Sequence, residues 1–247
     1  MRLLLLGCGL LLRELCDAII RSPHRIDAQF LPAGVHDQGA DNMRHRLQAA
    51  IDAADPKYDA IVLGYTLCGN GIAGLRARTV QLVVPRAHDC ITLLMGSRSK
   101  FQKYFDANPG VYYRSVGWVE HGEELQQQIA GLNIDCNRNA LIARYGESNG
   151  QYLFEEYTKY LHTYRQLTYI ETGLEPDGTF LQRAQAEAAA KNWSFSKLTG
   201  DLTLFRRLLS GDWTGEWDGD FLVVPPGSRI DPTYDQEIVK AVPDAGT

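Results

Sequence analysis

The chain has 247 residues, of which 45% are hydrophobic and 22% are charged, and its formal net charge is −5 at pH 7. This composition is ordinary for a soluble globular protein with one large domain or two smaller ones. It contains no basic stripe and no run of Lys and Arg interleaved with aromatic residues, so nucleic acid is not an expected partner. The apolar start, residues 3–6, is too short for a signal peptide, and no apolar run approaches the roughly 20 residues that span a membrane. We therefore expect a cytoplasmic protein.

Strand and helix patterns alternate in the first half of the chain. Short apolar runs predict buried strands, and apolar residues on one helical face predict helices. Strands are expected at residues 2–6, 26–31, 59–64, 80–84 and 111–116, and helices at residues 10–20, 41–54 and 89–105. This alternation predicts an α/β fold with a mainly parallel, Rossmann-like sheet that is flanked by helices.

The second half of the chain is less regular. Helices are expected at residues 151–164, 179–191 and 202–209, and strands at residues 167–171 and 221–224. Residues 123–147 show little helix or strand pattern and are typical of a connector. We therefore expect an N-terminal lobe (1–122) and a C-terminal α/β lobe (123–247) packed against it, with one continuous domain as the alternative. The polar tail from residue 231 is expected to be loose.

Three of the five cysteines follow predicted strands. Cys8 follows the first strand, Cys68 the third and Cys90 the fourth, while His36 follows the second. Because ligands of open α/β sheets bind outside the carboxyl ends of the strands, we expect these side chains to meet at one edge of the sheet. In a reducing compartment, such cysteines are more often metal ligands, nucleophiles or core residues than disulfide partners.

Each of the three cysteines has a setting that suits a thiolate. Cys8 lies between two glycines, and Cys68 opens the turn Cys-Gly-Asn-Gly. Cys90 follows Asp89, a candidate N-cap, so the helix dipole is expected to lower the pKa of its thiol. Three thiolates can hold a four-iron cluster with one iron open to substrate. Alternatively, Cys68 with Cys90 and the neighbouring His88 could hold zinc.

Other interpretations of these residues remain open. Cysteine is among the most frequently buried residues, and we expect Cys16 to be a core residue and Cys136 an inert thiol of a loop or the surface. Arg86 and His88 flank the predicted site and could supply positive charge or proton transfer, as could His36. Equally, His88 could make a hydrogen bond at a helix start, and His36 could be an exposed loop residue.

Residues 69–74 match the pattern G-x-G-x-x-G of dinucleotide-binding proteins. That motif needs a crossover helix before the next parallel strand. Only residues 75–79 separate it from the fourth predicted strand, too few for such a helix. Nucleotide binding is therefore not expected.

Residues 63–71 (LGYTLCGNG) and 85–90 (PRAHDC) resemble the domain of unknown function 1638 family of bacteria and archaea. Residues 7–9 (GCG), 31–36 (LPAGVH) and 169–173 (YIETG) extend the resemblance over most of the chain. The family has no settled activity, so the resemblance implies motifs rather than a reaction. It places Cys8, His36, Cys68 and Cys90 within those motifs. Some members lie near genes of corrinoid-dependent methyl transfer, which implies a corrinoid or methyltransferase partner.

We therefore predict a metal-dependent enzyme of the lyase or transferase type. Cys8, Cys68 and Cys90 would hold a 4Fe–4S cluster whose open position binds a small sulfur-containing or one-carbon substrate. The alternatives are a zinc Cys/His site in methyl transfer, a non-enzymatic metal or corrinoid accessory protein, and a metal-free enzyme that uses Cys90 with His88. Neither a nucleic acid nor a membrane is expected as a partner.

Overall fold

The computed structural model describes residues 1–122, 125, 138–158, 163–214 and 219–244, without the side chains of residues 36, 37, 140 and 156–158. Cys136 lies outside the described residues. The chain forms two compact units, one of residues 1–103, 172–174 and 199–247 and the other of residues 104–171 and 175–198. This division differs from the expected split at residue 122. The reason is that the chain returns to the first unit near its end, where a C-terminal strand joins the N-terminal sheet.

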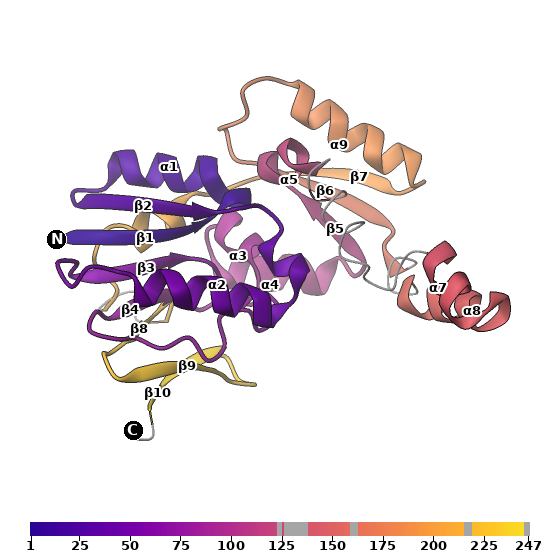
Figure 1. Ribbon diagram of the computed structural model, residues 1–247. Helices are drawn as coiled ribbons and strands as arrows, with labels where there is room; N and C mark the ends of the chain where they lie inside the picture. The colour runs from indigo at the N-terminus through magenta and orange to yellow at the C-terminus, as the bar shows by residue number, and fades with distance from the viewer. Residues whose placement is uncertain (123–124, 126–137, 159–162, 215–218, 245–247) are drawn as a thin grey trace. The chain divides into compact units, whose positions relative to one another are not determined.

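The first unit is built on a five-stranded sheet with the order β2-β1-β3-β4-β8 (Figure 1). Its strands are β1 (Arg2–Cys8), β2 (Arg25–Leu31), β3 (Ala60–Gly64), β4 (Leu82–Pro85) and β8 (Phe221–Val224). The first four are parallel, as expected, and β8 runs antiparallel to β4. The α/β class and the mainly parallel sheet are thus confirmed. The Rossmann-like arrangement is not, because the sheet is mixed.

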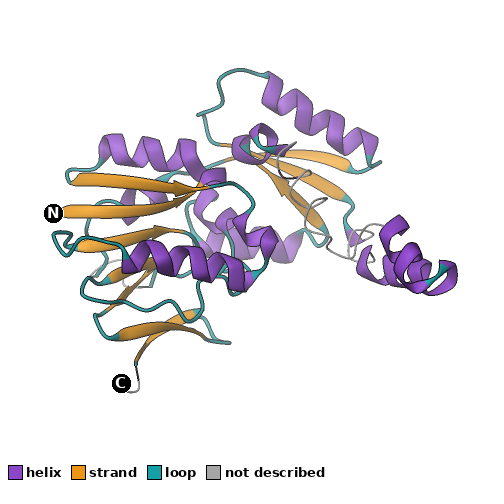
Figure 2. Cartoon of the chain, in the orientation of Figure 1, coloured by secondary structure: helices purple, strands orange, loops and turns teal. Residues whose placement is uncertain are grey.

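Helices flank this sheet (Figure 2). They are η1 (Gly9–Leu11), α1 (Leu12–Arg21), η2 (Val35–Gln38), α2 (Ala40–Asp52), α3 (Cys90–Leu94), α4 (Arg98–Ala107) and α10 (Thr203–Leu208). The single helix expected at residues 89–105 is divided into α3 and α4, because Gly96 between them has a φ of 70°, which no helix contains. All residues of β3 and β4 are buried, so these central strands form the middle of the core.

Two glycines on neighbouring strands bring α1 close to the sheet. Gly7 of β1 pairs with Gly64 of β3. A Cβ atom at Gly64 would lie 2.8 Å from a methyl group of the buried Leu15 of α1, and a Cβ atom at Gly7 would lie 3.0 Å from the same methyl group. Leu15 therefore occupies the space beside Gly64. At Gly7 the Phe30 ring lies closer still, 2.6 Å from the position of a Cβ atom, so packing against both side chains explains the glycine before Cys8.

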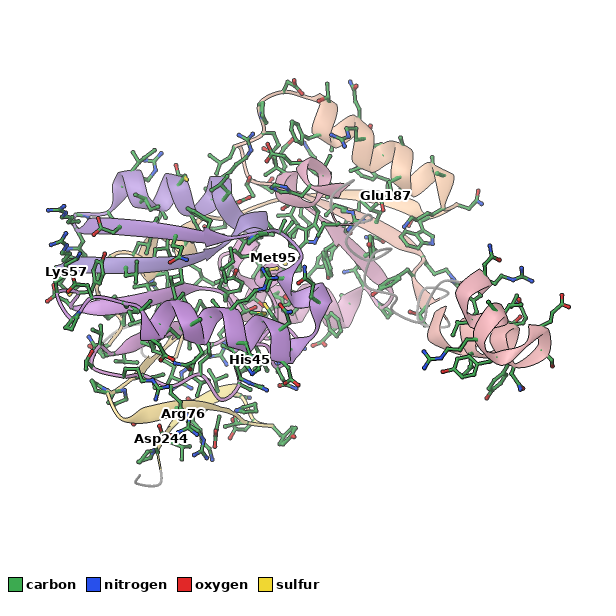
Figure 3. All side chains as sticks on the ribbon, in the orientation of Figure 1. His45, Lys57, Arg76, Met95, Glu187 and Asp244 are labelled. Atoms are coloured by element: carbon green, nitrogen blue, oxygen red, sulfur yellow. The ribbon has the colours of Figure 1, made fainter. Side chains whose placement is uncertain are left out.

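The segment that joins β3 to β4 contains no helix, in agreement with the sequence prediction. It pairs instead with the hairpin of β9 (Ser228–Pro232) and β10 (Val239–Pro243): the Gly74 amide donates to the Ile230 carbonyl at 2.7 Å. Arg76 and Asp244 form an ion pair of 2.9 Å beside this hairpin (Figure 3). The expectation of a loose tail from residue 231 is therefore wrong, because its backbone is hydrogen-bonded as a strand pair.

The second unit contains a three-stranded sheet with the order β5-β6-β7. Its elements are β5 (Val111–Arg114), α5 (Val116–Glu120), α7 (Arg138–Tyr145), α8 (Glu147–Thr158), β6 (Gln166–Glu171), α9 (Thr179–Ala190) and β7 (Ser194–Thr199). Leu167 and Tyr169 of β6 form a core with Ala184 and Ala188 of α9. Strand β7 was not expected, and α7 lies in the segment expected to be a connector. No helix in the described parts of either unit is long and apolar enough to cross a membrane.

An ion pair joins β5 to α9 in this unit. Both nitrogen-to-oxygen distances between Arg114 and Glu187 are 2.9 Å, and their side chains are only 18% and 26% exposed. Burial alone would raise the pKa of Glu187, but the hydrogen bonds and charge of Arg114 outweigh it and hold the pKa below its ordinary value. The ionised pair should therefore stabilise the unit at neutral pH.

We expect Glu187→Gln to lower the free energy of unfolding by about 1–3 kcal/mol at neutral pH. Because the folded pKa is depressed, this contribution is complete above the unfolded pKa of about 4.3 and disappears as the pH falls through the folded value. Urea titrations at neutral pH and at about pH 3 measure both effects. In the matched control, Glu171→Gln breaks the more exposed pair with Lys197 and should cost less than about 1 kcal/mol. Equal losses in the two variants would contradict this prediction.

Candidate functional site

The three cysteines of interest lie at the carboxyl edge of the first unit's sheet. Cys8 is the last residue of β1, Cys68 comes four residues after β3 ends at Gly64, and Cys90 begins α3 after β4. The connection from β1 leads to β2 on one side, whereas the connection from β3 leads to β4 on the other. The cysteines therefore surround the point where the direction of the connections reverses, which is where open α/β sheets bind ligands.

Backbone hydrogen bonds hold the loops of Cys68 and Cys90 together. The Leu67 amide donates to the Ala87 carbonyl at 2.9 Å, and the Cys68 amide donates to the His88 carbonyl at 3.0 Å. Cys68 itself has a φ of 44°, and the next two residues also have positive φ values. A non-glycine residue in this region is uncommon and is found most often at functional sites. The turn Cys-Gly-Asn-Gly is thus a defined left-handed turn.

The loop after β1 is held by a different contact. A Cβ atom at Gly9 would lie 2.8 Å from the Ala33 amide nitrogen and 2.9 Å from the Leu31 carbonyl oxygen, which are both backbone atoms. Glycine at this position therefore lets the chain after Cys8 touch the loop that follows β2. These contacts place Cys8, which is buried, against the neighbouring loop.

The thiols of the three cysteines are close enough to affect one another electrostatically. Burial raises the pKa of Cys90 well above its ordinary value, and the charges of Cys68, Asp89 and Cys8 raise it further. Burial also raises the pKa of Cys68, although the Thr66 hydroxyl, 3.0 Å from its sulfur, acts in the opposite direction. Cys68 and Cys8 are thus near enough to Cys90 for their charges to raise its pKa.

The expected lowering of the Cys90 pKa by a helix dipole is wrong. Asp89 does cap α3, since its carboxylate accepts from the Ile91 amide at 3.0 Å. However, α3 has only five residues, and the effect of burial is larger than that of so short a helix. A buried thiol with a raised pKa is a poor nucleophile at neutral pH, which argues against the metal-free cysteine enzyme.

Tyr65, which was not predicted to be a site residue, lies among these cysteines. It is the first residue after β3 and is 2% exposed. Its hydroxyl lies near Cys8 and Cys68, and a hydrogen bond to Cys8 is among the interactions that act on it. Burial and then the two neighbouring thiols raise the pKa of this phenol. Its position directly after a strand, inside the segment LGYTLCGNG, was the available signal in the sequence.

The other predicted site residues take different positions. His88 is exposed and lines a cleft of about 620 Å³ with Thr92 of α3, Gln102 of α4 and the loop that contains Tyr234. His36 lies in η2, as expected after β2, but its side chain is outside the described part of the structure.

The guanidinium of Arg86 is bonded to residues of the C-terminal segment. It forms an ion pair with Glu237 at 2.6 Å and donates to the carbonyls of Phe221 and Val239. Arg86 therefore holds the end of β4 to the C-terminal strands. These contacts give Arg86 a structural role, and its predicted chemical role stays a prediction.

Comparison with known families agrees with the motifs in these loops. The model of a family described as "Protein of unknown function (DUF1638)" matches residues 30–209, which is more than two thirds of the chain. The chain belongs to this family. The matched residues of this DUF1638 protein include the loops of Cys68 and Cys90, whereas Cys8 lies before them. No curated protein and no solved structure gives a match.

Two further observations bear on what the DUF1638 protein could hold. Among the described residues, no group of three or more His, Cys, Asp or Glu side chains is arranged to bind a single metal ion. No disulfide involves any of the four described cysteines, so the thiols of Cys8, Cys68 and Cys90 are not joined to one another.

Proposed function

We propose that this DUF1638 protein binds a 4Fe–4S cluster through Cys8, Cys68 and Cys90 and leaves one iron open to a substrate. One observation carries the proposal: three cysteines from the loops after neighbouring parallel strands lie close enough together that Cys68 and Cys8 raise the pKa of Cys90.

The chemistry of the donors supports a cluster rather than a mononuclear zinc ion. The three candidate donors are all sulfur atoms, and thiolates are the usual ligands of iron–sulfur clusters. Zinc held by Cys68, His88 and Cys90 would need imidazole as well. The exposed ring of His88 lines a cleft, whereas the Cys68 and Cys90 thiols are buried enough for their pKa values to rise. Metal binding would offset that cost, because a bound cation favours the deprotonated thiol.

The cleft beside α3 suggests how a substrate could approach. Its volume of about 620 Å³ suits a small molecule, and His88, which lines it, is a titratable group on the same loop as Cys90. We propose a small sulfur-containing or one-carbon substrate that binds the open iron, with His88 giving or taking a proton. The reaction would be of the lyase or transferase type. The cytoplasm is the proposed compartment, since thiols remain reduced there. A corrinoid protein or a methyltransferase is proposed as a partner from the family resemblance.

The proposal is tested by purifying the protein without oxygen and measuring its iron, acid-labile sulfide and zinc contents with an absorption spectrum. Iron and sulfide in cluster stoichiometry, with a brown colour that oxygen bleaches, are the expected result. Zinc without sulfide would overturn the cluster and favour the Cys/His alternative. A protein that holds no metal, even after anaerobic incubation with iron and sulfide, would show that the three thiols are structural. Substrate turnover would separate the enzyme from a metal or corrinoid carrier.

A further inference from the structure

We infer that the cleft beside α3 binds the anionic group, a carboxylate or a phosphate, of a small molecule through the side chains of Arg98 and Thr92. Every residue that lines this cleft belongs to the first unit. The anion site depends on the cleft alone and needs no metal. That the anion is part of the substrate rests on the proposed function, to which the inference adds the charge of the substrate.

The cleft has the size and the mixed lining of a small-molecule site. The loop after β4, α3, the first turns of α4 and the loop between β9 and β10 surround a volume of about 620 Å³. Ala87, Phe101 and Ile238 supply apolar surface. Ile238 has a φ of 65°, which a β-branched residue rarely adopts and which is found most often at functional sites.

Arg98 brings a positive charge to the cleft that no described carboxylate neutralises. Its guanidinium donates to the carbonyls of Gly219 and Gln236, and it forms no ion pair with a described residue. These contacts occupy two of the five N–H donors of an arginine. Neutral groups therefore hold the guanidinium in place, and its charge and remaining donors are available to an anion.

The hydroxyl of Thr92 is a second donor. Thr92 lies in α3 and lines the cleft, although only 3% of its surface is exposed. Its amide donates to the carboxylate of Asp89 at 3.4 Å, but its hydroxyl bonds to no described residue. Since buried hydroxyls are normally hydrogen-bonded, this one points to a ligand. An ionised oxygen of the ligand would accept from it.

The beginning of α4 faces the same cleft. Arg98 and Ser99 are the first two residues of this ten-residue helix, and both line the cleft. Neither amide donates to a described backbone carbonyl, as expected for the first turn of a helix. These free amides and the positive end of the helix dipole favour an anion at this place.

The acidic residues of the loop between β9 and β10 do not occupy Arg98. Asp235, which lines the cleft, accepts from the Thr233 hydroxyl at 2.7 Å and from the Glu237 amide at 2.9 Å. The carboxylate of Glu237 pairs with Arg86 at 2.6 Å. A ligand therefore does not have to displace a carboxylate of the protein from Arg98.

The experiment titrates inorganic phosphate and isotope-labelled acetate with the full-length protein at constant ionic strength. Broadening of the phosphorus and carbon magnetic resonance signals measures binding. We expect saturable binding of at least one anion. Tighter binding of phosphate would support a phosphorylated ligand, and tighter binding of acetate would support a carboxylate. Saturation by neither anion in the millimolar range would overturn the inference.

Variants locate the bound anion. Thr92→Val keeps the shape of the side chain and should weaken binding about tenfold, because a hydrogen bond to a charged group is lost. Thr92→Ser keeps the hydroxyl and should retain wild-type affinity. Arg98→Gln should weaken binding by about tenfold or more. Lys57→Gln is the matched control for charge, since Lys57 lies shortly before β3, at the amino edge of the sheet (Figure 3).

The outcomes separate this inference from the proposed cluster. Equal affinity in Thr92→Val, Thr92→Ser and the wild type would place the anion elsewhere and overturn the inference, even if Arg98→Gln fails to fold. Anion binding that depends on Thr92 in a protein without iron would support the anion site and overturn the cluster. Full iron and sulfide content without anion binding would leave the cluster intact and overturn the anion site.

Discussion

Serine at Cys68 is expected to reduce the iron and sulfide content of the protein to background. Serine keeps the size of the side chain and can still hydrogen-bond to Thr66, but it replaces a soft thiolate donor with a hydroxyl that binds iron poorly. Because the turn around Cys68 and its backbone bond to His88 remain possible, we expect the thermal unfolding curve to change little. Metal and sulfide analysis after anaerobic loading, together with circular dichroism, measures both quantities. The same loss is expected for Cys8→Ser and Cys90→Ser.

Cys16→Ser is the matched control for these variants. Cys16 lies in α1, and burial alone raises the pKa of its thiol, with no contribution from the other cysteines. We therefore expect this variant to hold as much iron and sulfide as the wild type. Full metal content in Cys68→Ser would remove the basis of the proposed site, whereas loss in Cys16→Ser as well would point to a general effect of cysteine replacement.

Valine at Gly9 is expected to lower the free energy of unfolding by about 3 kcal/mol, at the upper end for overpacked positions, and to impair cluster binding. The new Cβ atom would lie 2.8 Å from the Ala33 nitrogen and 2.9 Å from the Leu31 oxygen, and backbone atoms cannot move aside as a flexible side chain can. Separation of the two loops would shift Cys8, which directly precedes Gly9. Urea unfolding and metal content measure the two effects.

Gly178→Ala provides the control for this substitution. Its φ of −73° suits alanine, and no heavy atom lies within 4 Å of the position of the new Cβ. The free energy of unfolding should therefore change by less than about 0.5 kcal/mol, with full metal content. A Gly9→Val variant that is as stable as this control and binds a full cluster would show that the contact between the loops after β1 and β2 is unimportant.

The local sequence pattern was sufficient to predict most strands and helices of the first unit. The apolar runs of β1, β3 and β4 are short and bounded by glycine or proline, so their positions follow from sequence alone. The order of these strands follows in part from the preference for parallel pairing between strands that alternate with helices. The hairpin of β9 and β10 could not be predicted in this way. Its two strands of five residues mix polar and apolar side chains without a clear pattern, and the segment between β3 and β4 supplies backbone partners for β9.

The two-unit organisation also depends on contacts that sequence does not display. Strand β8 is recognisable as an apolar run, but nothing local shows that it pairs with β4, more than a hundred residues earlier. Strand β7 was missed because its residues alternate only weakly in polarity. In both cases the partner strand, which is distant along the chain, decides whether and where the segment pairs as a strand.

For the site, the sequence by itself determined that Cys8, Cys68 and Cys90 belong at one edge of the sheet. This follows because parallel strands carry what comes after them to the same side. Only the tertiary structure decided the state of these thiols. Burial of Cys90 outweighs the cap at α3, the guanidinium of Arg86 bonds to the C-terminal strands, and the phenol of Tyr65 lies beside two cysteines. Desolvation and the direction of a side chain depend on what packs around a residue, and that is a property of the whole fold.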